Sequence, residues 1–340
     1  MKFLITGGLG FIGTNLIKFL LSKNEHEILN LDKITYSANS SENKFFKLND
    51  LYSFVKGDIC DETLVTGLLN DFKPDFVMNL AAESHVDKSI SRPNDFIRTN
   101  IFGTTNLLNT TKDYWSKLSG EKKYQFRFHH ISTDEVFGSV FDDGLFHEES
   151  RYDPSSPYAA SKASSDHLVR AWHKTYGLPI LISNCSNNYG PYQYPEKLIP
   201  LIILNALELK SLPIYGNGLQ VRDWLHVEDH VKALYKIITN GTVGETYNIG
   251  ANNQINNIKL VKNICNFLDS ELKEKQKGIQ SYKDLIRYVD DRPGHDVCYG
   301  IDARKIKKEL DWNPEIDFQL GIQKTIRWYI NNKFLYITKK

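Results

Sequence analysis

The chain predicts an α/β fold of the Rossmann type, a doubly wound parallel sheet followed by a smaller C-terminal α/β domain. In the first half, short apolar runs alternate with longer amphipathic stretches, and a glycine-rich turn directly follows the first run. After about Tyr189 the elements become shorter and turn-rich segments join them. Strands separated by helical stretches form parallel βαβ units. We therefore expect one domain over residues 1–185 and a second over 186–340, with a segment near 224–250 returning to the first.

The expected strands are short apolar runs bounded by polar or turn-forming residues. One long helix has clear ends, because Ser156 precedes Pro157 at its start, and Gly177 and Pro179 stop it. The expected strands are Lys2–Thr6, Glu27–Asp32, Ser53–Asp58, Asp75–Ala82, Gln125–Thr133 and Ile180–Asn184.

Composition narrows the class of protein. The 340 residues are 41% hydrophobic and carry a formal net charge of +1, which favours a large buried core and argues against nucleic-acid binding. The apolar N-terminal stretch is interrupted by glycines and has no cleavage site, so we expect neither a signal peptide nor a membrane span. Four scattered cysteines form no CxxC pair, so we expect no disulfide, no metal site and a cytoplasmic location. These cysteines are Cys60, Cys185, Cys265 and Cys298.

The glycine-rich turn predicts a dinucleotide site in the first domain. Gly7, Gly10 and Gly13 follow the first strand, and glycines there let the backbone turn tightly and approach a pyrophosphate at a helix N-terminus. Asp32 ends the second strand about 20 residues on, where a carboxylate accepts hydrogen bonds from the adenosine ribose. The same carboxylate would repel a 2′-phosphate. The expected cofactor is therefore NAD rather than NADP.

Asp58 has two interpretations. Its position after the third strand would bring it to the adenine of the cofactor. Alternatively, Asp58 would be the N-cap of the helix whose sequence begins at Asp61.

Tyr158 and Lys162 lie four residues apart on the predicted long helix and therefore share one face. Tyr158 is the expected base for a sugar hydroxyl, because the Lys162 ammonium and the positive nicotinamide would favour its phenolate and lower its pKa. Lys162 would also hold the nicotinamide ribose. Thr133, at a strand end, would hydrogen-bond the same sugar oxygen.

Asp134 and Glu135 follow Thr133 and should lie at the carboxyl edge of the parallel sheet. Two crowded carboxylates cannot both ionise freely, so one pKa should rise and leave an acid beside a base. Simple hydride transfer needs no such pair, so the pair indicates an elimination. After oxidation at carbon 4 of a hexose, one carboxylate would remove the carbon-5 proton while the other protonates the departing 6-hydroxyl. Hydride would then return to carbon 6. The alternative is that Asp134 and Glu135 only cap or solvate a loop.

Several strings resemble the extended short-chain dehydrogenase/reductases, and within them the dTDP-glucose 4,6-dehydratases, over essentially the full length. They are TGGLGFIG, LAAESHVDKSI, STDEVFG, YAASK, NCSNNYGPYQYPEKLIP, VRDWLHVEDH and DRPGHD. The resemblance implies an NAD-dependent hydro-lyase of nucleotide-sugar metabolism that converts dTDP-glucose to dTDP-4-keto-6-deoxyglucose and serves a deoxysugar such as rhamnose. It implies Asp134 as acid, Glu135 as base at carbon 5 and Tyr158 as base for the 4-hydroxyl.

Two alternatives stay open. A related 4-epimerase or decarboxylase would share Tyr158 and Lys162 but would not need the carboxylate pair. A catalytically silent NAD-sensing or scaffold protein would be expected to lack Tyr158, Lys162 or Asp134, and all three are present.

The expected site residues fall into three groups. The catalytic residues are Thr133, Asp134, Glu135, Tyr158 and Lys162. The cofactor-binding residues, most of them implied by the resemblance, are Gly7, Gly10, Phe11, Ile12, Gly13, Asp32, Lys33, Thr35, Asp58, Ile59, Leu80, Ala81, Ala82, Ser84, Thr99, Tyr158, Lys162 and Asn188. The substrate-binding residues implied by the resemblance are Ser84, Thr133, Asn187, Lys197, Leu198, Pro213, Tyr215, Arg222, Asn257, Arg292 and His295.

The chemistry of the substrate group suits a nucleoside diphosphate sugar. Arg222 and Arg292 offer bidentate forks for a diphosphate, Lys197 adds donors, and Tyr215 offers a flat wall for a base. Phe137 departs from the Tyr that the family often has at that position.

Assembly is expected to be a two-fold homodimer. The stretches Asn94–Trp115 and Ser156–Tyr176 carry more apolar residues than one sheet face would bury. The resemblance implies that such helices pair.

Overall fold

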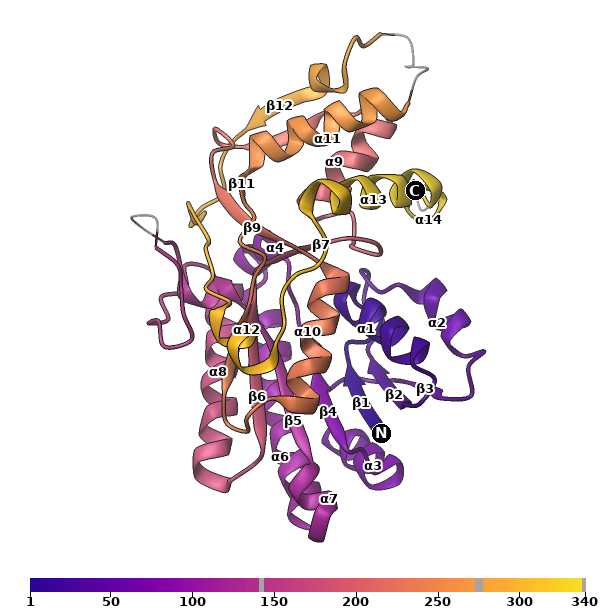
Figure 1. The fold of residues 1–340 in the computed structure, drawn as a ribbon, viewed down its shortest axis with the longest axis vertical. Helices are drawn as coiled ribbons and strands as arrows, with labels where there is room; N and C mark the ends of the chain where they lie inside the picture. Colours follow the sequence, from indigo (N-terminus) through magenta and orange to yellow (C-terminus); the bar gives the residue numbers. More distant parts are fainter. Residues whose placement is uncertain (141–143, 273–277, 338–340) are drawn as a thin grey trace.

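A seven-stranded parallel sheet forms the larger lobe of the computed structural model, which describes residues 1–140, 144–272 and 278–337. Its strand order is β10-β6-β5-β4-β1-β2-β3 (Figure 1). From β1 the chain first adds β2 and β3 on one side and then crosses over to add β4, β5 and β6 on the other. All six strands expected from the sequence are present, with ends that differ by at most a few residues. The strands are β1 (Lys2–Thr6), β2 (Glu27–Asp32), β3 (Tyr52–Lys56), β4 (Phe76–Asn79), β5 (Arg127–Thr133), β6 (Ile180–Cys185) and β10 (Thr246–Ile249).

Helices cover both faces of this sheet, as the Rossmann prediction requires. The apolar cores assign α1, α10 and α12 to one face and α3, α6 and α8 to the other. The long helices are α1 (Phe11–Ser22), α3 (Glu62–Phe72), α6 (Thr104–Ser116), α8 (Pro157–Tyr176) and α10 (Val227–Asn240). The shorter ones are α2 (Ser40–Phe46), α4 (Val86–Ser91), α5 (Pro93–Phe96), the π-helix η1 (Ile97–Gly103), α7 (Gly120–Gln125), the 3₁₀ turn η2 (Asp134–Phe137) and α12 (Arg304–Leu310).

The ends of α8 are those expected from the sequence. The Ser156 hydroxyl accepts a hydrogen bond from the Ala159 amide at 3.1 Å, and Pro157 occupies the first turn. The helix ends at Gly177, whose φ of 72° is a left-handed conformation that glycine adopts without steric cost. These caps fix where Tyr158 and Lys162 face.

Asp61, not Asp58, caps α3. The Asp61 side chain accepts the Leu64 amide at 3.0 Å, so the interpretation of Asp58 as that N-cap is wrong. Asp58 instead forms an ion pair with Lys33 at 2.9 Å.

The smaller lobe has its own apolar core, and Figure 1 shows its helices together at one end of the molecule. A three-stranded sheet contains β7 (Asn187–Tyr189), β9 (Val221–His226) and β11 (Gln254–Asn256). A two-stranded parallel sheet pairs β8 (Leu212–Tyr215) with β12 (Ile286–Val289). The helices and turn of this lobe are α9 (Leu198–Leu207), α11 (Asn257–Glu271), η3 (Tyr282–Leu285), α13 (Phe318–Asn331) and α14 (Phe334–Ile337).

The chain returns to the larger lobe twice after residue 186. In the first return, α10 packs on the large sheet and β10 pairs with β6, within the segment expected near 224–250. The second return, through α12, was not expected from the sequence. Ile306 and Trp312 are buried in the same apolar core as α1 and α10, so the span 186–340 is interrupted twice.

Phe137 packs as an apolar side chain. Its ring stacks on Phe146 at 5.2 Å and meets Tyr152 edge-on at 5.1 Å. A hydroxyl at this position would therefore sit among apolar rings. Among the described residues, no helix is long and apolar enough to cross a lipid bilayer.

Buried histidines make the fold acid-sensitive. Burial lowers the pKa of His129 and His230 to about 3, and that of His130 and His226 to about 4, from 6.5. Below pH 6.5 these histidines bind protons in the unfolded chain, whereas in the folded chain they do so only near pH 3–4. Their contribution to the free energy of unfolding is therefore complete above pH 6.5 and decreases as the pH falls below it. Each such group contributes at most about 1.4 kcal/mol per pH unit across this window.

We predict that His230→Leu flattens the decline of the free energy of unfolding between pH 6.5 and 4. His230 is fully buried, and neither ring nitrogen has a hydrogen-bond partner among the described residues. Urea unfolding at a series of pH values measures the slope, and His167→Leu at an exposed site of α8 is the matched control. A slope unchanged in His230→Leu would contradict the prediction.

Candidate active site

The glycine-rich turn between β1 and α1 forms a cradle that only glycine fits. Gly7 has a φ of 71°, and a Cβ there would lie 2.6 Å from the Ala81 nitrogen. A Cβ on Gly13 would lie 2.5 Å from the Gly7 carbonyl oxygen. Gly10 is the N-cap of α1 and provides no capping side chain, so the helix presents backbone N–H groups to the cavity beside it. Such an end suits a pyrophosphate.

Two adjoining cavities run along this edge of the sheet, and they share Gly7, Gly10, Leu80 and Ala82. The first, called the outer cavity, lies beyond the end of β2. It is lined by other expected cofactor-binding residues, among them Asp32, Lys33, Thr35 and Asp58. The inner cavity reaches Tyr158, Lys162 and Asn188. Every cofactor-binding residue predicted from the sequence lines one of the two cavities. The residues present thus fit an extended dinucleotide.

Asp32 is held in place by backbone donors. Its carboxylate accepts the Leu9 amide at 2.9 Å and the Ile34 amide at 2.7 Å. Burial raises the pKa of Asp32, and these two hydrogen bonds oppose that rise. The carboxylate therefore faces the outer cavity as a fixed acceptor.

The five expected catalytic residues meet in the inner cavity. Thr133 ends β5, Asp134 and Glu135 form the first half of η2, and Tyr158 and Lys162 come from the first turns of α8. The Thr133 hydroxyl accepts the Glu135 amide at 3.3 Å and donates to Asp134 at 3.3 Å. The strand end and the helix thus bring the two sets together.

Asp134 is placed to hold a proton. It is 2% exposed, and its Oδ2 has no partner among the described residues. Burial raises the pKa of Asp134 well above its usual range, and the negative charges of Glu135 and Asp223 raise it further. A buried carboxyl in this environment favours the neutral acid.

Glu135 is more easily ionised than its neighbour. Burial raises its pKa as well, but Lys197, Arg292 and Arg222 all oppose that rise. From the sequence, repulsion between the two carboxylates was expected to separate their pKa values. In the structure burial is the largest cause of the raised pKa of each carboxyl group. More cations lie near Glu135 than near Asp134, and this difference favours a base at Glu135 and an acid at Asp134.

The expectation that Lys162 lowers the pKa of Tyr158 is wrong for the protein by itself. Burial, followed by the charge of Glu135, raises the pKa of Tyr158 well above its usual range, and a hydrogen bond to Thr133 opposes this. The Lys162 ammonium donates instead to the Ile131 carbonyl oxygen at 2.9 Å and lies 3.3 Å from His130 Nε2. The positive charge that would favour the phenolate must therefore come largely from the bound cofactor.

A buried polar network supports Lys162 from below. His130 lies 3.4 Å from Asp166 Oδ1, and Asp166 Oδ2 accepts Tyr152 at 2.9 Å and Asn184 at 3.2 Å. Burial lowers the pKa of Lys162 to about 8, and the Asp166 charge opposes that fall. This network fixes the position of the ammonium in the inner cavity.

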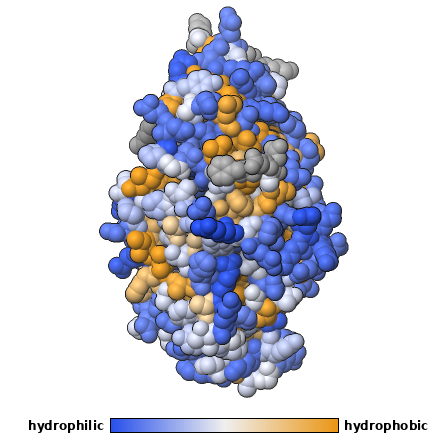
Figure 2. Space-filling view, turned by 90° about the vertical axis from the view of Figure 1, so that its left-hand side faces the viewer, coloured by the Kyte–Doolittle hydropathy of each residue, from blue (hydrophilic) through white to orange (hydrophobic). Residues whose placement is uncertain are grey.

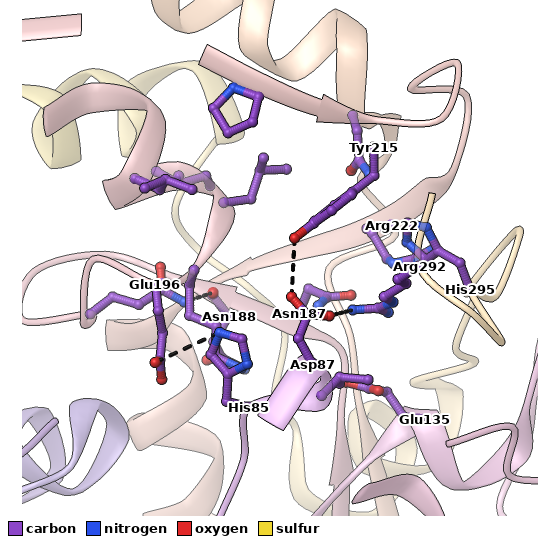
Figure 3. Close-up of a pocket in the computed structure, with 18 of the residues that line it drawn as sticks. His85, Asp87, Glu135, Asn187, Asn188, Glu196, Tyr215, Arg222, Arg292 and His295 are labelled. Carbon is purple, nitrogen blue, oxygen red and sulfur yellow. Dashed lines mark hydrogen bonds and ion pairs between the residues drawn. The ribbon is translucent and has the colours of Figure 1, made fainter. Parts of the chain in front are cut away.

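A third cavity between the two lobes holds the expected substrate residues. Asn187, Lys197, Leu198, Pro213, Tyr215, Arg222, Asn257, Arg292 and His295 line it, whereas Ser84 and Thr133 line the adjoining inner cavity. Glu135 lines both, so the reacting centre stands where the cavities join. Figure 3 shows Arg222, Arg292 and His295 on the opposite side of this cavity from Glu196 and His85.

The arginine forks are partly engaged within the protein. The Arg222 guanidinium donates to the carbonyl oxygens of Val221 and Asp296 at 2.8 and 2.9 Å and lies 4.2 Å from the Tyr299 ring centroid. Arg222 therefore has fewer free N–H donors for a bidentate contact with a diphosphate than expected, although the residue lines the cavity. Arg292 pairs only loosely with Asp87, at 3.8 Å, and its Nε has no partner among the described residues.

Sequence reasoning missed several side chains at this site. Asp87 accepts the Tyr215 hydroxyl at 3.1 Å, as Figure 3 shows, and Glu196 lines both the inner and the third cavity. Both residues lie within sequence strings that resemble the family. Their position beside expected site residues in those strings could have identified them as further candidates. Trp224, which also stands in one of these strings, and Tyr299, which stands in none, line the third cavity as well.

His85 and His295 have carboxylate neighbours but no metal-ligand cluster. His295 Nδ1 lies 2.5 Å from Asp291, and His85 Nε2 lies 3.7 Å from Glu196. Within the described residues, no group of three or more His, Cys, Asp or Glu side chains is placed to hold a metal ion.

Known proteins resemble this chain over nearly its whole length. Residues 4–325 match the family model described as GDP-mannose 4,6 dehydratase. The dTDP-glucose 4,6-dehydratase of Escherichia coli is 54% identical over 98% of this chain and 94% of that protein. The crystal structure of dTDP-glucose 4,6-dehydratase from Bacillus anthracis in complex with NAD has a TM-score of 0.87 at 42% identity, covering all of both chains. That of Streptomyces venezuelae, also with NAD bound, has a TM-score of 0.90 at 39% identity, again over all of both chains.

Proposed function

This chain belongs to the dTDP-glucose 4,6-dehydratase family, and we propose how its own residues carry out the reaction. It is a hydro-lyase that uses NAD to convert dTDP-glucose to dTDP-4-keto-6-deoxyglucose and water. The observation that carries the proposed roles is the unequal environment of Asp134 and Glu135.

The glycine cradle, Asp32 and Lys162 would hold the cofactor. The N-terminus of α1 would receive the pyrophosphate, and Asp32 would accept the adenosine ribose hydroxyls. When bound, NAD accepts a hydride from carbon 4 of the sugar and returns it to carbon 6. Lys162, held by Ile131 and His130, would orient the nicotinamide ribose from the floor of the inner cavity.

Tyr158 would take the proton of the 4-hydroxyl. Its neighbour Thr133 would hold the same sugar oxygen, because both line the inner cavity. A raised pKa makes the phenolate a strong base once a nearby cation permits it to form.

Glu135 and Asp134 would then perform the elimination. Glu135, opposite three cationic side chains, would remove the carbon-5 proton next to the new ketone. Asp134, buried and protonated, would donate its proton to the departing 6-hydroxyl, which leaves as water. An epimerase or decarboxylase would not need this acid beside a base.

The third cavity would hold the rest of the substrate. Arg292, Lys197 and the charge of Arg222 would face the diphosphate, and Tyr215 with Pro213 would flank the base. These charges also support the ionised form of Glu135, so binding the diphosphate and setting up the base would share the same cations.

We also propose a homodimer in the cytoplasm. Ile97 and Phe102 on η1 and Tyr176 at the end of α8 are 51%, 61% and 50% exposed. Figure 2 views the molecule from the side on which α8 lies in Figure 1, and apolar patches are visible there between hydrophilic residues. Pairing through these helices would bury such side chains.

A substrate with deuterium at carbon 4 should give a product with deuterium at carbon 6. The proposed cycle moves the same hydride out and back, so the purified enzyme should turn over without added reductant. Mass spectrometry and proton NMR of the product measure the label. Its loss to solvent or to free reduced cofactor would contradict the cycle.

Single substitutions should separate oxidation from elimination. Tyr158→Phe should abolish both steps, whereas Glu135→Gln should still oxidise carbon 4 and then stall, because an amide cannot remove the carbon-5 proton. General acid–base groups contribute about a hundred- to ten-thousand-fold, so the stalled enzyme should accumulate bound reduced cofactor. Asp134→Asn should lie between these, since its amide still donates a hydrogen bond but delivers no proton. Stopped-flow absorbance at the reduced-cofactor band is the measurement.

The wild-type enzyme, mixed in the same way, serves as the control for that accumulation. A Glu135→Gln enzyme that dehydrates at the wild-type rate would mean that the adjacent carboxylates are structural.

Phe102→Glu should convert the proposed dimer to monomers, because it places a charge on the apolar face of η1. Multi-angle light scattering should give twice the chain mass of 39.2 kDa for the wild type and the single mass for the variant. Tyr124→Glu, on α7 and 81% exposed, is the control that should stay dimeric. A wild-type chain that is monomeric at working concentration would refute the proposed assembly.

A further inference from the structure

The segment Pro191–Lys197, called the strap here, crosses from β7 to α9 beside the inner cavity. Four of its residues, Gln193, Tyr194, Glu196 and Lys197, line that cavity. The strap belongs in sequence to the smaller lobe, yet most of its polar contacts reach the larger one. Its position therefore depends on contacts between the lobes.

The first part of the strap is tied to α1 and to the loop after β2. Asn15 donates to the Pro191 carbonyl oxygen at 3.0 Å, and Lys18 donates to the Tyr192 hydroxyl at 2.8 Å. Asn39 donates to the Tyr192 carbonyl oxygen at 3.1 Å. These contacts lie near the glycine cradle but leave the second half of the strap to be held elsewhere.

Glu196 and Lys197 hold the second half, and Lys197 Nζ donates to the Ser84 carbonyl oxygen at 2.7 Å. The Tyr36 hydroxyl lies 2.9 Å from each of the two carboxylate oxygens of Glu196, and Lys88 Nζ lies 2.9 Å from one of them. Lys88 Nζ also lies 3.3 Å from the centroid of the Tyr36 ring, so the three side chains contact one another. His85 approaches Glu196 from α4, as Figure 3 shows.

The three side chains come from three segments that surround the cofactor cavities. Tyr36 lies on the loop that carries Lys33 and Thr35, which line the outer cavity. Lys88 lies on α4, two residues beyond its start. Glu196 lies on the strap and lines the inner cavity. Opening the strap would require these contacts to break.

We propose that Tyr36, Lys88 and Glu196 form a clasp that keeps the strap closed over bound NAD and sets the rate at which the cofactor leaves. They are positioning residues, since none of the three is required for the proton transfers. The inference rests on the proposed function, in which the cofactor must stay in place between the two hydride steps. A dehydrogenase that exchanges its cofactor every turnover would gain nothing from such a clasp.

The test measures release of NAD without substrate. Holoenzyme loaded with radiolabelled NAD is chased with unlabelled NAD, and the retained label is followed by rapid filtration. Tyr36→Phe removes the hydroxyl and keeps the ring beneath Lys88, and it should speed release about ten-fold, the lower end for a hydrogen bond to a charged group because Tyr36 is half exposed. Tyr288→Phe, the same change at an exposed site on β12, should release NAD at the wild-type rate.

Further variants test whether the contacts act together. Glu196→Gln and Lys88→Met should each speed release, and Tyr36→Phe combined with Glu196→Gln should speed it by less than the product of the two single effects, because Glu196→Gln weakens the same hydrogen bond that Tyr36→Phe removes. With dTDP-glucose, Tyr36→Phe should shed free reduced cofactor during turnover, while excess NAD restores its dehydration rate.

Wild-type release rates in both Tyr36→Phe and Glu196→Gln would overturn the clasp. Additive effects of the two would also overturn it, because they would show that the side chains act separately. Lack of dehydratase activity in the wild-type enzyme would refute the proposed function, while the release rates would still decide the clasp.

Discussion

Parallel strands bring all their carboxyl ends to one edge of the sheet, and the chemistry of this protein depends on that constraint. The turn after β1 places Gly7, the end of β2 places Asp32, and the end of β5 places Thr133 with the two carboxylates behind it. Because β1 lies between β2 and β4, the crossovers leave in opposite directions there and open a crevice for a ligand. Because β4 pairs with both β1 and β5, the cofactor cradle and the reacting groups lie close together at this edge.

Burial then determines what the reacting groups can do. Removing Asp134 from water favours its neutral form, and the same effect on Glu135 is offset by cations of the third cavity. In the proposed mechanism, two adjacent carboxylates with nearly the same backbone environment thereby take opposite roles. The cations belong mainly to the smaller lobe, so the acid–base pair exists only when the two lobes pack together. Tyr158 shows the limit of this arrangement, because its burial raises a pKa that the protein itself does little to lower.

Local patterns were sufficient for the parts of the fold that local chemistry specifies. The strand ends, the Ser156 cap and the Gly177 stop follow from residue types at fixed spacing, and the structure has them. The family strings also identified residues that line the cavities. By contrast, the return of the chain through α12 could not be read from the sequence, because the apolar residues Ile306 on α12 and Trp312 just after it specify burial but not which core they enter. The engagement of Arg222 could not be predicted either, since one of its carbonyl partners, that of Asp296, is brought near only by the fold, whereas the other belongs to its sequence neighbour Val221.

The electrostatic prediction for Tyr158 failed because its partner Lys162 was chosen by sequence distance. Lys162 is one helical turn from Tyr158, yet its ammonium bonds to β5 carbonyl and imidazole groups and is balanced by Asp166, one turn further along α8. This arrangement anchors the cation in the inner cavity through β5 and Asp166 instead of through Tyr158. Separating the anchored cation from the proton acceptor leaves room between them for a nicotinamide ribose. The proposed clasp follows the same logic across the cavity, because its side chains have no role in the proposed proton transfers. In the proposed cycle the cofactor must stay bound between the two hydride steps. The groups that retain it are therefore kept apart from the groups that gain and lose protons, so that a change of charge in the second set does not loosen the first.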